Sequence, residues 1–182
     1  MQTNESSRAH RPLSNEYLLY LLRHGIAVAR GAPGFSEDSR RPLTPEGKVR
    51  MREIAAGLRR LGVSLDWIVT SPLVRAVETA EIVAESFEHH IPLDFCDALR
   101  PGSTPEALLT FLGKHRERRE VMVVGHEPDL SMLACRLIGA GRHTGLALKK
   151  GGGGLIAFSS FPPRTAGELR LLLTPKVLRK LA

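Results

Sequence analysis

Short apolar runs alternate with amphipathic stretches along most of the chain, a pattern typical of an α/β protein. Four apolar runs are too short for lone buried helices and predict strands at residues 17–22, 65–71, 91–96 and 120–126. Between them and after the last, apolar residues at helical spacing predict helices at residues 45–61, 72–87, 105–114 and 128–138. Strands that alternate with helices predict a three-layer sandwich, in which helices cover both faces of a mostly parallel sheet.

The ends of the first two helices carry recognisable signals. Thr44 is a favourable N-cap for the first helix, Pro45 suits its first turn, and Gly62 stops it. Ser71 is predicted to cap the second helix, which we expect to open at Pro72.

The last part of the chain changes period. Three further strands are predicted at residues 144–149, 153–160 and 167–174, followed by a short terminal helix. They would add an antiparallel edge to the sheet. No repeat or internal linker is visible, so we expect a single domain over residues 16–182, preceded by a loose polar tail at 1–15.

Composition narrows the class of protein. The 182 residues are 42% hydrophobic and contain no run of 18 apolar residues, so we expect no membrane span. The polar start lacks the apolar stretch of a signal peptide, and Cys96 and Cys135 are the only cysteines, so we expect a cytoplasmic protein with reduced thiols. The net charge of +7 fits a plain cationic surface, an anionic substrate or nucleic acid. The basic stretches at 114–119 and 176–180 contain no aromatic residues, which gives base stacking little support.

Polar residues follow three of the predicted strands. The first strand ends in Arg23-His24-Gly25, the second in Ser71 with Arg75 one turn later, and the fourth in His126. Ligands of open α/β sheets bind beyond the carboxyl ends of the strands, and parallel strands bring these ends to one edge. We therefore expect two arginines, two histidines and two helix N-termini in one place.

Such a cluster suits a phosphate group. Two guanidinium groups repel by roughly 4 kcal/mol at 4 Å and an effective dielectric near 20, and a doubly charged anion between them would relieve that cost. The planar fork of arginine matches phosphate oxygens, and helix N-termini add N–H donors. A neutral imidazole is a good nucleophile near pH 7, and the surrounding cations should disfavour the charged form of His24. Gly25 lets the chain turn sharply beside it and lets the backbone approach the bound phosphate.

These residues resemble the histidine phosphatase superfamily, whose mark is an Arg-His-Gly after the first strand. The resemblance continues in "SPLVRAVETA" (71–80) and "VVGHEP" (123–128), while "SRRPLTPEG" (39–47) and the short chain are similar to its SixA-like branch of phosphohistidine phosphatases. The resemblance implies a two-step reaction through a phosphorylated His24, with Arg23, Arg41, Arg75 and His126 in the phosphate pocket. It implies no metal and no cofactor.

The source of a general acid is open. Larger members carry an acidic residue after the third strand, where this chain offers only Asp97 and Glu106, in no family pattern. Alkyl phosphates need a protonated leaving oxygen, whereas the nitrogen of phosphohistidine is easily protonated, so a phosphorylated protein is the favoured substrate. A histidine phosphotransfer domain is one such partner. The alternatives are a phosphatase of small phosphate esters and, in a different class, a silent phosphate-binding or nucleic-acid-binding protein.

The remaining predictions concern the partners of the chain, the glycine-rich stretch at residues 149–154 and two acidic residues beside a helix. We expect a monomer with no membrane contact and no specific nucleic-acid partner. Residues 149–154, "KKGGGG", lack the Ser or Thr of a phosphate-binding loop and predict a turn before a strand. Glu127 and Asp129 are expected to act on the N-terminus of the following helix through its dipole.

Overall fold

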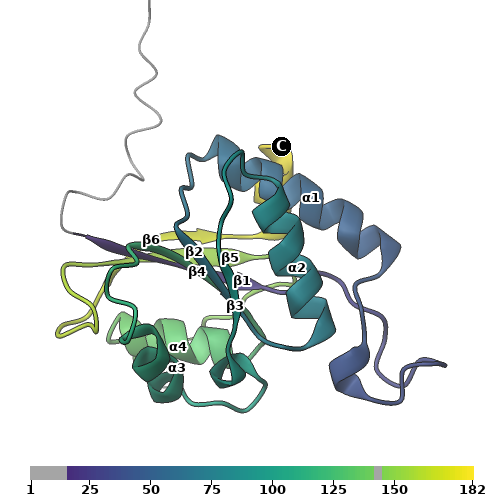
Figure 1. Cartoon of the computed structure of the whole chain (residues 1–182), viewed down its shortest axis with the longest axis horizontal. Helices are drawn as coiled ribbons and strands as arrows, with labels where there is room; N and C mark the ends of the chain where they lie inside the picture. The colour runs from purple at the N-terminus through teal and green to yellow at the C-terminus, as the bar shows by residue number, and fades with distance from the viewer. Residues whose placement is uncertain (1–15, 142–144) are drawn as a thin grey trace, which may run out of the picture.

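One mixed sheet forms the centre of the molecule (Figure 1). The computed structural model describes residues 16–141 and 145–182, and within them the strand order is β3-β2-β4-β1-β5-β6. The strands are β1 Tyr17–Arg23, β2 Trp67–Thr70, β3 Leu93–Phe95, β4 Glu120–Gly125, β5 Gly153–Phe158 and β6 Glu168–Leu173. The first four strands pair in parallel, and β5 and β6 add the antiparallel edge. The predicted fold class is confirmed.

Helices cover both faces of this sheet. They are α1 Pro45–Arg60, α2 Val74–Glu85, α3 Pro105–Leu112, α4 Asp129–Leu137 and α5 Pro175–Lys180, with single 3-10 turns η2 at Asp38–Arg40 and η3 at Asp97–Leu99. In Figure 1, α1 and α2 lie on one side of the sheet, and α3 and α4 lie on the other. Along β1, Leu18, Tyr20 and Leu22 pack toward α1, α2 and α5, while Leu19 and Leu21 pack toward α3 and α4. The period of two along each strand thus separates two hydrophobic cores.

The first helix begins and ends as predicted. The Thr44 side chain accepts a hydrogen bond from the backbone N–H of Gly47 at 2.9 Å, and Gly62 takes a positive φ of 76°. A Cβ at Gly47 would overlap the carbonyl of Ile26, so this glycine allows the start of α1 to dock directly onto the loop after β1.

Two local predictions were wrong. Residues 145–149 form no strand, because the backbone of Leu148 pairs with side chains of the strand ends instead of a neighbouring strand. Ser71 is not the cap of α2, which begins at Val74 with Leu73 in the cap position and no side-chain cap. The predicted tail at 1–15 and residue 144 lie outside the described residues. No helix in the described part of the chain is long and apolar enough to span a membrane.

Candidate active site

The carboxyl ends of β1, β4 and β2 lie side by side. Arg23 pairs with Gly125 in the parallel register, and Thr70 pairs with Val124. The backbone N–H of His24 then donates to the carbonyl of Gly125 at 3.1 Å, which continues the ladder one residue beyond β1. As a result the rings of His24 and His126 lie next to each other, tilted by 55°, with centroids 5.1 Å apart. The sheet therefore gathers the polar strand ends at one edge.

His24 is a buried, neutral imidazole. Only 7% of its surface is exposed, and its Nδ1 lies 2.7 Å from the carbonyl oxygen of Gly25. Because a carbonyl only accepts, Nδ1 carries the proton and Nε2 keeps its lone pair. Burial is the main cause that lowers the pKa of His24 to about 3, and His126, Arg75 and Arg23 add to it, while the Gly25 carbonyl opposes it. The cations predicted to hold His24 neutral thus contribute less than burial does.

Gly25 is required for close packing, which differs from the reason inferred from the sequence. Its φ is not positive, but a Cβ here would lie 2.7 Å from Cγ of Met51 in α1. Its N–H donates to Oγ1 of Thr79 at 3.1 Å, and the Thr79 hydroxyl donates to the carbonyl of Arg75 at 2.7 Å. Thr79 therefore links the loop after His24 to the turn of α2 that carries Arg75.

Ser71 orients the second histidine. Its Oγ lies 2.9 Å from Nε2 of His126 and also accepts from the backbone N–H of Leu73 at 3.4 Å. The Ser71 hydroxyl is fully buried and has no other acceptor for its proton among the described residues, so it donates to Nε2 and leaves the proton of neutral His126 on Nδ1. Burial first, and then Arg75, lower the pKa of His126 to about 4.

Arg23 is held by the segment that was predicted to be a strand. Its Nη1 donates to the carbonyl of Leu148 at 2.6 Å, and the N–H of Leu148 donates to Oε1 of Glu127 at 3.2 Å. The other carboxylate oxygen of Glu127 accepts from Ser131 at 2.7 Å. Glu127 was predicted to act on a helix dipole, but its hydrogen bonds show that it anchors residues 145–149 to the end of β4.

Asp38 lies between two arginines and was not predicted from the sequence as a site residue. The Nη1 and Nη2 of Arg75 donate to its carbonyl and its Oδ2 at 2.7 and 2.9 Å, and Arg41 donates to its Oδ1 through Nη2 at 2.7 Å. These two arginines hold the pKa of Asp38 far below its usual range, against the effect of burial. The carboxylate thus offsets the repulsion between arginines that a bound phosphate alone was predicted to relieve. The visible signal was an acidic residue three positions before Arg41.

Three nitrogen atoms at this edge are buried and have no hydrogen-bond partner in the described structure. They are Nε of Arg23, Nε of Arg75 and Nδ1 of His126. Arg75 is 3% exposed and His126 is 3% exposed. Buried donors without acceptors are costly, and they mark a place where an oxyanion would be stabilised. Among residues 16–141 and 145–182, no group of three His, Cys, Asp or Glu side chains is arranged to hold a metal.

Comparisons with known proteins agree with this arrangement. Residues 19–101 match the family model of the histidine phosphatase superfamily (branch 1). An uncharacterized protein of Picosynechococcus sp. is 38% identical over 166 residues, which cover 88% of this chain and 98% of that protein. The chain belongs to the histidine phosphatase superfamily.

Two solved structures of phosphatases share the fold of this chain. The protein histidine phosphatase SixA, complexed with tungstate, superposes with a TM-score of 0.74 at 22% identity and covers 88% of this chain and 99% of its own. The alpha-ribazole phosphatase of Shigella flexneri gives 0.67 at 18% identity, with 87% and 96% covered. At these identities the likeness establishes the fold, which is shared by phosphatases with different substrates.

Neither Asp97 nor Glu106, the two candidates for a general acid, is free of a salt-bridge partner. The side chain of Asp97 is 82% exposed and pairs with Arg100 at 2.6 Å. Glu106 is 64% exposed and pairs with Arg136 of α4 at 3.3 Å. Asp129, at the start of α4, accepts from the N–H of Gly102 at 3.0 Å. These carboxylates therefore hold surface loops and helices.

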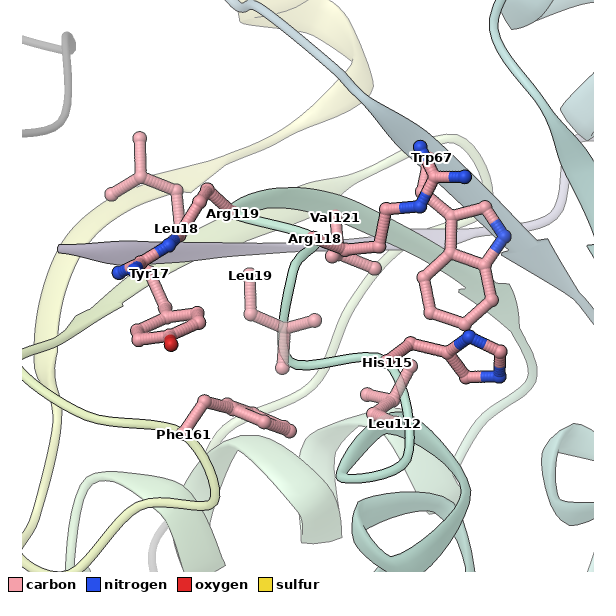
Figure 2. Close-up of a pocket in the computed structure, with 10 residues that line it drawn as sticks. All are labelled: Tyr17, Leu18, Leu19, Trp67, Leu112, His115, Arg118, Arg119, Val121 and Phe161. Carbon is pink, nitrogen blue, oxygen red and sulfur yellow. The ribbon is translucent and has the colours of Figure 1, made fainter. Parts of the chain in front are cut away.

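The opposite edge of the sheet carries an aromatic pocket (Figure 2). It lies at the starts of β1, β2 and β4, where Tyr17 and Phe161 flank one side and Trp67 and His115 the other. Its volume is only about 20 Å³, and Trp67 is 1% exposed. Arg119 lies over the Tyr17 ring at 4.1 Å. The fold thus brings aromatic rings to the basic stretch 114–119, but Trp67 is buried, Tyr17 and Phe161 are half-buried, and a pocket of this volume does not hold a base.

The two site histidines predict a loss of stability in mild acid. Their pKa values are lowered in the folded chain, so between the ordinary value of about 6.5 and the lowered values the unfolded chain binds more protons. Above about pH 6.5 the two histidines should not lower the free energy of unfolding. As the pH falls below that value, each histidine should lower the free energy of unfolding by up to about 1.4 kcal/mol per pH unit. Urea unfolding across this range measures the slope. His24→Gln should reduce the slope of the free energy of unfolding against pH, whereas His90→Gln, at an exposed position, should leave the slope unchanged. Equal slopes in wild type and His24→Gln would contradict the expectation.

Asp38→Asn should destabilise the protein by about 1 kcal/mol or more, because it removes the charge between Arg41 and Arg75. Added inorganic phosphate would replace that charge, so it should raise the melting temperature of the variant more than that of the wild type. The control is Asp97→Asn, which removes an exposed pair and should behave as wild type. An Asp38→Asn protein as stable as wild type would show that the carboxylate is not needed as a counter-ion.

Proposed function

We propose that this chain is a phosphatase that hydrolyses protein phosphohistidine through a covalent phospho-His24 intermediate. One observation carries the proposal: a neutral His24 with its Nε2 lone pair free, next to the three unpartnered donors of Arg23, Arg75 and His126. The donors suit the oxygens of a phosphoryl group, and the lone pair suits its phosphorus.

In the first step, Nε2 of His24 attacks phosphorus and forms a new P–N bond. The P–N bond of the substrate breaks, and the leaving imidazole keeps the electron pair and takes a proton from water. Arg23, Arg75 and His126 stabilise the charge on the phosphoryl oxygens, and Arg41 lines the pocket beside Arg75. The charge is balanced by nitrogen donors of the protein, so we expect turnover to persist in the presence of a metal chelator.

In the second step, water attacks the phosphorus of phospho-His24. The P–N bond breaks, its electron pair returns to Nε2, and inorganic phosphate leaves. The hydrogen bond from Nδ1 to the Gly25 carbonyl keeps the ring in one tautomer through both steps.

Among the described residues, four candidate acids are each engaged by other groups, and this supports phosphohistidine as the substrate. Asp97 and Glu106 are exposed and paired, Glu127 accepts two hydrogen bonds, and Asp38 stays ionised between arginines. An alkoxide leaving group needs a proton donor at this point, whereas the imidazole nitrogen of phosphohistidine does not depend on one from the enzyme. A small phosphate ester is the second candidate, because the alpha-ribazole phosphatase of Shigella flexneri shares the fold.

The test is phosphate release from a phosphohistidine-bearing phosphotransfer domain, beside a panel of small phosphomonoesters. We expect kcat/KM on the protein to be higher by about a hundredfold, which is about 2.7 kcal/mol of transition-state preference. A preference for a small ester would overturn the assignment of substrate while keeping the covalent chemistry. Release by a His24→Ala preparation sets the blank.

A further inference from the structure

A basic groove lies beside the loop that follows His24. It has a volume of about 490 Å³ and is bounded by Gly25 and Ile26, by α1, by α5 and by the turn at Lys150. His24, Arg75 and His126 are not among its lining residues. The groove is therefore a separate surface that adjoins the catalytic edge through Gly25.

The charge of this groove has one sign. Its charged lining residues are Arg50, Lys150, Lys176, Arg179 and Lys180, and no acidic residue lines it. Arg50 is paired with Glu46 and Arg179 with Glu53. Within the described chain, the three lysines form no ion pair and are exposed. Like charges gathered without counter-ions favour the binding of an anion.

Two sequence features that the catalytic site does not use meet here. Residues 149–154 supply Lys150, and the basic stretch 176–180 supplies the charges of α5. Gly151 has a positive φ of 74°, and a Cβ there would lie 2.6 Å from Cδ1 of Ile54. This glycine lets the turn pack on α1, which holds Lys150 against the groove. The turn predicted for 149–154 is thus used to place a charge.

We propose that this groove docks an acidic segment of the phosphoprotein substrate, an inference that rests on the proposed function. A segment bound there would pass Gly25 and hold the rest of the partner close to His24. Lysine ammonium groups are point charges without a fixed fork, so they suit carboxylates in varied positions. The lining contains no aromatic ring on which a base could stack, and this favours an acidic protein over single-stranded nucleic acid.

The binding arm of the test needs no catalysis. A fluorescein-labelled oligoglutamate peptide is titrated with wild type and with Lys176→Gln/Lys180→Gln, and anisotropy gives the dissociation constant. We expect the double variant to bind at least about tenfold more weakly, with a weaker dependence on salt. The matched control, Lys114→Gln/Arg116→Gln, removes two charges from the basic stretch at the opposite edge and should bind as wild type. Equal weakening in both variants, no binding by wild type, or tighter binding of an oligonucleotide would overturn the proposal.

The catalytic arm compares two substrates of the same variants. The ratio of kcat/KM on the phosphotransfer domain to kcat/KM on free phosphohistidine should fall at least about tenfold in the groove variant, through KM on the protein. The control should keep the wild-type ratio, and an unchanged ratio in the groove variant would contradict substrate docking. Peptide binding at the groove by a protein that releases no phosphate from phosphohistidine would instead refute the proposed function alone.

Discussion

His24→Ala is expected to lower turnover of any phosphorylated substrate by at least about 10⁴-fold, because it removes the atom that forms the covalent bond. Nε2 of His24 is the free end of a ring that the Gly25 carbonyl holds in one tautomer. His126 does not take its place, since its Nε2 is bound by Ser71. The measurement is phosphate release at saturating substrate, beside intact-mass detection of the phosphorylated protein after rapid quenching.

The matched control replaces an imidazole that is exposed. His90→Ala removes a side chain outside the core and should keep wild-type turnover and phosphoenzyme. His24→Ala should retain the folded circular dichroism spectrum, because both hydrophobic cores lie along the strands below the site. A phosphorylated species in folded His24→Ala, or turnover within about tenfold of wild type, would show that another residue is the nucleophile.

Arg75→Lys is expected to lower kcat/KM by about 10²- to 10³-fold, although it conserves the charge. Arg75 uses Nη1 and Nη2 to hold Asp38 and leaves Nε, buried and unpartnered, for the substrate. A lysine has one ammonium group and cannot occupy both places. Steady-state kinetics on the phosphotransfer domain measure the loss, which should appear in kcat because the interaction strengthens in the transition state.

Arg30→Lys makes the same exchange at the other side of the same carboxylate. Arg30 also contacts Asp38, at 3.1 Å, but its side chain is 83% exposed. The screened pair contributes little, so this variant should keep kcat/KM within about twofold of wild type. If Arg75→Lys and Arg30→Lys behave alike, the buried Nε of Arg75 does not act on the substrate.

Regular elements follow from the sequence because their causes are local. The helix α1 begins at a Thr-Pro pair and ends before a glycine, and the apolar period of two along β1 predicts its two buried faces. The placement of polar residues at three strand ends also predicts which side chains meet, since parallel strands end at the same edge of a sheet. The sequence by itself therefore determined the layers, the candidate nucleophile and its arginine and histidine neighbours.

The remaining features depend on contacts between distant segments. Asp38 neutralises Arg75 across 37 positions, and Ser71 turns from a predicted helix cap into the partner of His126 across 55 positions. Residues 145–149 have strand-like composition, but the carbonyl and N–H of Leu148 are taken by Arg23 and Glu127. Likewise, the lysine groove exists only because α5 packs beside α1 and the turn at Lys150. Hydrogen bonding and burial between segments decided these features, and neither is encoded in the local pattern of a single segment.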